Sequence, residues 1–136
     1  MLLHQLFETT VRRVPDKVAL VTGARRYTYR ELDTLAVRLA ASLQRLGVRR
    51  GDRVTIFADN GVEVVAGVFG ALKAGAVFMP VNPLTKSDKL AYLLNDSRAA
   101  CLVTTEVLRG VWEQALAQNT SVHRCLVSGL LSADAD

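Results

Sequence analysis

The chain has 136 residues, of which 50% are hydrophobic, and its 17 Lys and Arg residues against 13 Asp and Glu residues give a net charge of +4. This length fits a single domain, and the apolar content is enough for a packed core and excludes a disordered chain. The basic residues are scattered without an interleaved aromatic stripe, so we expect no nucleic-acid partner.

The chain opens with a predicted helix and a predicted hairpin. Apolar residues at helical spacing predict a helix over residues 2–14, and Pro15 ends it. This segment lacks the basic start, apolar centre and cleavage site of a signal peptide, and no stretch is apolar enough for a transmembrane segment, so we expect the protein in the cytoplasm. The runs "VALVTG" (residues 18–23) and "RRYTY" (residues 25–29) predict two strands joined by a glycine turn.

The segment "TYRELDTLAVRLAASLQRLG", residues 28–47, carries the clearest helix signal. Thr28 and Glu31 have the spacing of a capping box, and the leucines of the segment fall on one face. Gly47 is placed to end the helix in a left-handed conformation. Glu31 and Asp33 lie near the exposed start, where we expect solvent to surround both carboxylates.

A strand over residues 54–58 follows a tight turn at Gly51 and leads to a second apolar helix. Asn60 is predicted to cap this helix, which covers residues 61–73. Its residues are almost all apolar or small, so we expect it to be buried on more than one side. Gly67, Gly70 and Gly75 weaken it as a helix but would permit close packing on the sheet or on a neighbouring element.

The stretch "LKAGAVFMPVNP", residues 72–83, holds a strand at residues 76–79 with no polar residue to mark a solvent face. Such a strand suits a parallel sheet that is covered on both faces. Further elements are expected as helices over residues 87–95, with Ser87 as N-cap, and 106–118, and as strands over residues 101–104 and 125–127. The predicted fold class is therefore α/β: an N-terminal helix and hairpin, then alternating βαβ units in a mostly parallel sheet covered by helices.

The residues by themselves offer no self-contained active site. The phosphate loop GxxxxGK[ST], the dinucleotide motif GxGxxG and the nucleophile motif GxSxG are all absent. His4 and His123 have no metal-site spacing, and Cys101 and Cys125 lie in short apolar runs where we expect inert core thiols. We therefore expect no catalytic residue and no metal ligand in this chain.

Two stretches, "YTYREL" (residues 27–32) and "LKAGAVFMPVNP" (residues 72–83), resemble the first two core motifs of one enzyme family. Between and around them stand "PDKVALV", "LGVRRGDRV" and "LAYLLNDSRAACLVT", in the order that this family shows. The chain is thus similar to the N-terminal part of the AMP-forming ligases, which include acyl-CoA synthetases, aryl-CoA ligases and the adenylation domains of peptide synthetases. The ending "VNP" looks more like the CoA synthetases than the amino-acid-activating domains, in which "LD" is common.

The resemblance implies a reaction for the full-length parent enzyme. A carboxylic acid attacks the α-phosphate of ATP to give an acyl-adenylate and pyrophosphate, and the thiol of CoA or of a carrier protein's phosphopantetheine then takes the acyl group. Mg²⁺ and basic groups neutralise the phosphate charge that develops.

The resemblance also implies that the parent is longer than this segment. In the family, a phosphate loop similar to "TSGTTGxPKG" follows soon after the last predicted strand, whereas this chain ends with "LVSGLLSADAD". Residues 1–136 are then an incomplete N-terminal segment of the ligase's large domain, inactive alone, without a bound cofactor, and partnered by the remainder of the ligase chain. An uncovered sheet edge or apolar face should make the isolated segment self-associate. The alternative is a truncated, non-catalytic relative that acts as a binding or interaction module.

One binding region follows from the resemblance. The loop after the strand at residues 76–79 should lie near the surface on which the CoA nucleotide rests, which points to Asn82, Pro83 and Leu84. Arg109 would be a phosphate partner across the loop that follows the strand at residues 101–104. The alternative for these residues is a stiff turn and a solvated arginine.

Overall fold

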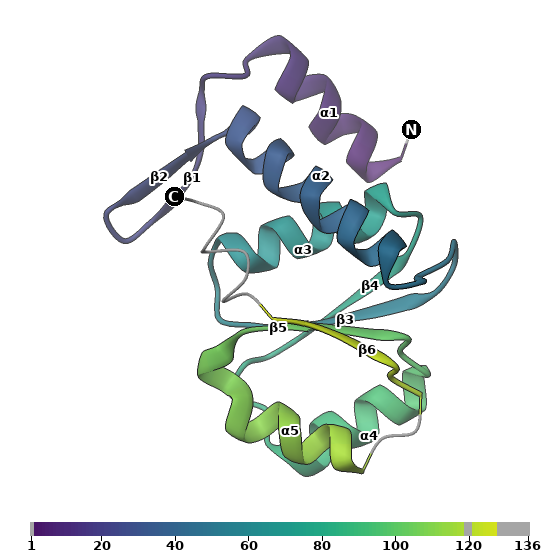
Figure 1. The fold of residues 1–136 in the computed structure, drawn as a ribbon. Coiled ribbons are helices and arrows are strands. Elements are labelled where there is room, and N and C mark those ends of the chain that lie inside the picture. The colour runs from purple at the N-terminus through teal and green to yellow at the C-terminus, as the bar shows by residue number, and fades with distance from the viewer. Residues whose placement is uncertain (1, 119–120, 128–136) are drawn as a thin grey trace.

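The computed structural model describes residues 2–118 and 121–127 (Figure 1). The predicted departure from a phosphate loop falls at residues 128–136, which lie outside the described residues. The elements are α1 (Leu3–Arg13), β1 (Val18–Thr22), β2 (Arg25–Thr28), α2 (Tyr29–Arg45), β3 (Arg53–Phe57), α3 (Val62–Lys73), β4 (Val77–Val81), α4 (Ser87–Ser97), β5 (Cys101–Thr104), the short 3₁₀ helix η1 (Glu106–Leu108), α5 (Arg109–Ala117) and β6 (Arg124–Val127).

Four strands form a parallel sheet in the order β4-β3-β5-β6, and β1 and β2 form a separate antiparallel hairpin. Helices α2 and α3 lie on one face of the sheet and α4 and α5 lie on the other, while α1 packs beside α2 and α3 (Figure 1). A helix connects each strand of the sheet to the next one along the chain, as parallel pairing requires. The predicted α/β class is confirmed.

The position of β4 differs from its prediction. The sequence predicts a strand buried on both faces, but β4 lies at an edge of the described sheet and Val77 is 52% exposed. The reason is the path of the chain, because α3 leads to one side of β3 and α4 leads back to β5 on the other side. The fully buried runs are therefore residues 54–57 and 101–104 in β3 and β5. Pro80 fits an edge strand, since proline lacks the N–H that a central strand uses.

Helix α2 begins and ends as the sequence predicts. The Thr28 hydroxyl accepts a hydrogen bond from the Glu31 N–H at 3.2 Å, and Glu31 Oε1 accepts one from the Thr28 N–H at 3.0 Å. These two bonds complete the predicted capping box. Gly47 follows the helix with a φ of +89°, the left-handed conformation that favours glycine.

A largely buried lysine joins three helices. Lys73 Nζ, at the end of α3, lies 2.7 Å from Glu8 Oε1 of α1 and 3.0 Å from Asp33 Oδ1 of α2. Burial opposes the charge on Lys73, but its hydrogen bond to Glu8 and its ion pair with Asp33 outweigh burial and raise its pKa. The bond from Lys73 lowers the pKa of Glu8. The expectation that solvent surrounds Asp33 is therefore wrong. Helical spacing shows which face of α2 holds Asp33 but does not show that α3 ends beside it.

Two glycines let α3 approach its neighbours closely. A Cβ added at Gly70 would lie 2.8 Å from Leu39 Cδ2 and 2.9 Å from Leu39 Cβ of α2. A Cβ added at Gly67 would lie 3.1 Å from Ile56 Cδ1 of β3. Gly67 and Gly70 are buried, so the prediction of close packing is confirmed for these two. Gly75 follows the end of α3 and is exposed.

Two threonines are fully buried in the central strands and differ in hydrogen bonding. The Thr104 hydroxyl of β5 donates to the Phe57 carbonyl oxygen of β3 at 2.6 Å. The Thr55 hydroxyl of β3 has no hydrogen-bond partner in the described structure. A buried hydroxyl without a partner costs about 1–3 kcal/mol, so Thr55 is a point at which the core is less stable than its packing would allow.

Two predicted helix starts need correction. Gly61, and not Asn60, holds the N-cap position of α3, and no side chain accepts a hydrogen bond there. The helix expected over residues 106–118 consists of η1 and then α5, since its first turn tightens to a 3₁₀ helix, as first turns often do.

The substitution Gly70→Ala is expected to destabilise the protein by about 1–3 kcal/mol, because overpacking against Leu39 outweighs the ~1 kcal/mol gained in helix propensity. Gly110→Ala in α5 is the control, because nothing lies within 4 Å of an added Cβ there. The control should stabilise the protein by about 0.5–1 kcal/mol. Urea unfolding of both variants measures the difference, and a Gly70→Ala protein as stable as the control would contradict the close contact.

The substitution Thr55→Val should raise the free energy of unfolding by about 1 kcal/mol, because it removes a buried hydroxyl that has no partner. Thr104→Val is the matched change on the neighbouring strand and should lower the free energy of unfolding by about 1–3 kcal/mol, because it removes a made hydrogen bond. The same unfolding measurement compares the two. Equal effects of the same sign would show that the two hydroxyls do not differ in hydrogen bonding.

Candidate functional site

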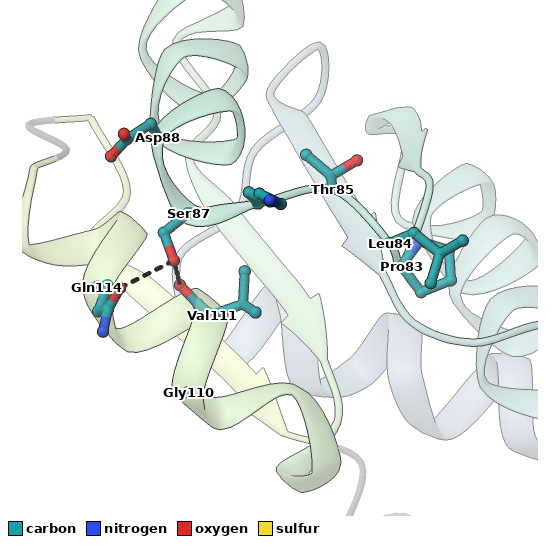
Figure 2. A pocket seen from close by; sticks show the side chains of 9 residues that line it. Pro83, Leu84, Thr85, Ser87, Asp88, Gly110, Val111 and Gln114 are labelled. Atoms are coloured by element: carbon teal, nitrogen blue, oxygen red, sulfur yellow. Dashed lines mark hydrogen bonds between the residues drawn. The ribbon is translucent and has the colours of Figure 1, made fainter.

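An open groove of about 570 Å³ lies between the loop after β4 and the start of α5 (Figure 2). Residues 83–88 form one wall, and Gly110, Val111 and Gln114 form the other. The walls combine apolar side chains with the opposite charges of Lys86 and Asp88. The groove is therefore suited to holding an amphipathic ligand at the surface.

Asn82 shapes the loop that forms the first wall. Its Oδ1 accepts a hydrogen bond from the Leu84 N–H at 2.8 Å, and its carbonyl oxygen accepts one from the Thr85 N–H at 3.0 Å. Pro83 between them has a fixed φ, which stiffens the turn. The turn leaves the Leu84 side chain 86% exposed beside the groove.

Ser87 connects the two walls. It is the first residue of α4 and Lys86 holds the N-cap position, so the prediction that Ser87 caps the helix is wrong. Its hydroxyl lies 3.1 Å from the Val111 carbonyl oxygen and 3.2 Å from Gln114 Oε1 (Figure 2). The Ser87 hydroxyl has one proton, so it donates a hydrogen bond to one of these acceptors at a time. The side chain thus fastens the start of α4 to α5 instead of to its own helix.

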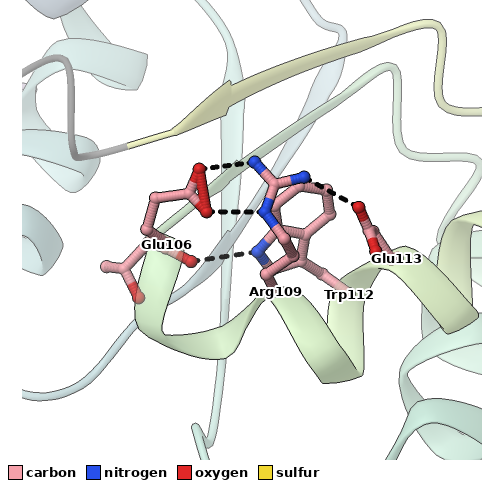
Figure 3. Close-up of polar contacts among 5 residues, drawn as sticks. Glu106, Arg109, Trp112 and Glu113 are labelled. Carbon is pink, nitrogen blue, oxygen red and sulfur yellow. Dashed lines mark hydrogen bonds and ion pairs between the residues drawn. The ribbon is translucent and has the colours of Figure 1, made fainter.

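Arg109 immediately precedes the groove residue Gly110, and its guanidinium faces two carboxylates (Figure 3). Its Nε lies 2.6 Å from Glu106 Oε2, its Nη1 lies 2.7 Å from Glu113 Oε1, and its Nη2 also pairs with Glu106. The hydrogen bonds to these carboxylates raise the pKa of Arg109, and the bond from Arg109 lowers the pKa of Glu106. The guanidinium carbon also lies 4.7 Å from the centroid of the Trp112 ring.

The structure brings together part of the predicted site. Pro83 and Leu84 line the groove, and Asn82 supports their turn. Arg109 precedes the groove residue Gly110, but Arg109 is not one of the residues that line the groove. Two carboxylates occupy the donors with which a guanidinium would bind a phosphate. Contact between Arg109 and a CoA phosphate would require these pairs to open, and it stays a prediction.

Sequence reasoning missed the wall that α5 contributes. Gly110, Val111 and Gln114 face the loop because α5 packs beside α4, which no local pattern in either segment reveals. The ion pairs of Arg109 could have been predicted from the sequence, because Glu106 stands three residues before Arg109 and Glu113 stands four residues after it. That spacing places charges side by side on a helix.

The two cysteines lie on neighbouring strands and point to opposite faces of the sheet. Cys125 pairs in register with Leu102, and Cys101 pairs with Arg124. Burial raises the pKa of the Cys101 thiol to about 12 and that of Cys125 to about 11. Neither thiol is therefore ionised near neutral pH. The prediction of a core position is confirmed for Cys101, which is buried, whereas Cys125 is only partly buried.

Residues 2–118 and 121–127 lack two other kinds of site. They contain no group of three or more His, Cys, Asp or Glu side chains that could hold a metal ion. In the same residues no helix is long and apolar enough to cross a membrane.

Known proteins with similar sequences share this segment. Residues 7–135 match the family described as AMP-binding enzyme. Bacitracin synthase 1 of Bacillus licheniformis is 45% identical over 106 residues, which are 78% of this chain and 2% of that protein. Malpibaldin synthetase of Mortierella alpina is 44% identical over 106 residues, again 78% of this chain and 2% of that protein.

Solved structures share the fold. An anthranilate CoA ligase in complex with anthranoyl-AMP has a TM-score of 0.87 at 28% identity, over 93% of this chain and 24% of that chain. MbtA of Mycobacterium smegmatis has a TM-score of 0.84 at 34% identity, over 95% of this chain and 24% of that chain. This chain therefore spans about a quarter of these two solved chains and a far smaller share of the two synthetases. Because the family match covers nearly every residue and the fold agrees with it, the chain belongs to the family of AMP-binding enzymes.

Proposed function

We propose that this chain is the N-terminal segment of the large domain of an AMP-forming ligase. The whole enzyme uses ATP and Mg²⁺ to convert a carboxylic acid to an acyl-adenylate and pyrophosphate, and then passes the acyl group to the thiol of CoA or of a carrier protein. The observation that carries the proposal is the family match over residues 7–135, joined to the fold shared with a ligase in complex with anthranoyl-AMP. We place the enzyme in the cytoplasm.

Within this proposal, residues 1–136 contribute structure and binding, and the rest of the enzyme supplies the catalytic groups. Adenylate formation needs cationic groups at the phosphate on which charge develops. Lys73 and Arg109 already pair with two carboxylates each. Their paired state supports the proposal that neither cation acts on the phosphate during adenylate formation, and it supports a structural role for Lys73.

The identity of the acceptor thiol, CoA or a carrier protein, is not the same in the sequence-based prediction and in all of the similar structures. The ending "VNP" at residues 81–83 favours CoA. The similar solved structures include both a CoA ligase and a nonribosomal peptide synthetase. The experiment must therefore offer both acceptors.

The whole enzyme should release pyrophosphate from ATP when its carboxylic acid is supplied, and residues 1–136 alone should not, because the groups that bind the phosphates lie elsewhere. A screen of aliphatic, aromatic and amino acids for pyrophosphate release identifies the acid. Mass spectrometry after addition of CoA, or of a carrier protein with its phosphopantetheine, then shows which thioester forms.

Two outcomes would contradict this division of labour. Pyrophosphate release by residues 1–136 alone would place catalysis inside the segment. An intact mass of 14.8 kDa for the protein in its source cells would mean that no catalytic remainder exists. The non-catalytic binding module would then replace the ligase.

We also propose that the CoA nucleotide rests on the loop of Asn82, Pro83 and Leu84, with Arg109 as its phosphate partner. The exposed Leu84 offers an apolar surface for the base, and Lys86 adds a cation in the same groove. Leu84→Ala and Arg109→Gln should each raise the KM for CoA several-fold without changing pyrophosphate release. Val107→Ala is the control, because Val107 is 85% exposed and lies outside the groove. If a variant has the same KM for CoA as the control, the substituted residue does not belong to the CoA site.

The isolated segment should self-associate, because among the described residues no strand pairs with the outer edge of β4, which also carries the exposed Val77. Val77→Lys should weaken this association, since a charged residue on an edge strand disfavours strand pairing. Val37→Lys on α2 is matched in exposure, 50% against 52% for Val77, and should leave association unchanged. Analytical ultracentrifugation of residues 1–136 measures the effect. A monomer at high concentration, or equal effects of the two lysines, would reject pairing through β4.

A further inference from the structure

The chain has one Asn-Gly step, Asn60–Gly61, in the exposed turn between β3 and α3. The helix cap that the sequence predicts for Asn60 does not form, because Gly61 takes the N-cap position. Neither the Asn60 side chain nor the Gly61 N–H has a hydrogen bond in the described structure. The side-chain carbonyl carbon of Asn60 and the backbone nitrogen of Gly61 are therefore both unrestrained.

Gly61 also offers little steric hindrance to contact between these two groups. Gly61 has an extended conformation, with φ 167° and ψ −163°. It has no Cβ to obstruct the Asn60 side chain as that side chain turns toward the Gly61 nitrogen. The carboxylate of Glu63 lies beside Gly61, since Glu63 Oε2 would be 3.3 Å from a Cβ built there.

We propose that Asn60–Gly61 is a site of spontaneous deamidation, at which Asn60 is converted to a mixture of aspartate and isoaspartate. The Gly61 backbone nitrogen loses its proton to a solvent base and attacks Cγ of Asn60. The new C–N bond closes a five-membered imide, and the side-chain nitrogen leaves as ammonia. Water then adds to either imide carbonyl and breaks one C–N bond. Nothing is oxidised or reduced, and water is the only co-reactant.

Two other asparagines provide internal comparisons. Asn82 precedes Pro83, whose nitrogen carries no proton and cannot close the ring. Asn95 lies in α4, and its Nδ2 donates to the Gln118 carbonyl oxygen at 3.1 Å. The helical backbone and this bond hold its side chain away from the next nitrogen. We therefore expect Asn60 to change while Asn82 and Asn95 stay intact.

The two products should affect the fold differently. Both place a new carboxylate near Asp59 and Glu63, where the positive end of α3 favours it and the neighbouring acids oppose it. Isoaspartate also routes the main chain through the side-chain carbon and lengthens the connection from β3 to α3. Because β3 pairs with both β4 and β5, we expect isoaspartate to weaken the sheet more than aspartate does.

The test incubates the purified protein, at its full natural length, in mildly alkaline buffer at physiological temperature. The peptide that contains residue 60 should gain about one dalton, and an isoaspartyl methyltransferase should label it. The peptides with Asn82 and Asn95 should keep their masses. Mildly acidic buffer should slow the change, because the attacking nitrogen must lose its proton.

Gly61→Ala is the matched control. Its extended φ is open to any residue, so the variant should fold, and its methyl group should slow the conversion several-fold. Three results would overturn the proposal: no mass gain at residue 60 while a synthetic peptide of residues 54–73 converts, a mass gain without isoaspartate, or equal rates in the parent and Gly61→Ala. The second result would indicate direct hydrolysis of the side-chain amide.

Discussion

The close approach of α3 to α2 at Gly70 is the contact on which one half of the molecule depends. Any side chain at Gly70 would meet Leu39 at less than normal van der Waals distance. Because α3 approaches α2 closely, it also lies close to the sheet. Gly67 of α3 contacts Ile56 of β3, and α3 covers this face of β3. The close approach also brings Lys73 of α3 within ion-pair distance of α1 and α2. The two glycines lower the helix propensity of α3. The close packing that they permit holds α1, α2, α3 and the central strand β3 together.

The other face of the sheet shows how the chain path creates the groove. After β4 the chain must cross back over β3 to reach β5, and the turn at Asn82 begins this crossing. Ser87 then fastens the start of α4 to α5. The loop and α5 form the two walls because the crossover places them side by side. Ligands of parallel α/β sheets bind beyond the carboxyl ends of the strands, where this loop lies.

Internal charge pairing accounts for the absence of an evident reactive centre in the described part of the chain. Lys73 and Arg109 each face two carboxylates, and burial keeps both thiols protonated. Such groups stabilise and position their neighbours. This pairing fits the proposed division of roles, in which other parts of the ligase supply the charges that act on phosphate.

The sequence by itself determined the order of elements, the capping box and end of α2, the small-residue face of α3, the stiff Asn82 loop and the family. These features depend on helical periodicity, on the conformations open to Gly and Pro, and on motifs within single segments. Only the tertiary structure decided that β4 is an edge strand, that Asp33 pairs with Lys73, that Ser87 bonds to α5 and that α5 completes the groove. Each of these depends on which distant segments become neighbours, and that is set by the packing of whole helices on the sheet, which no local pattern encodes.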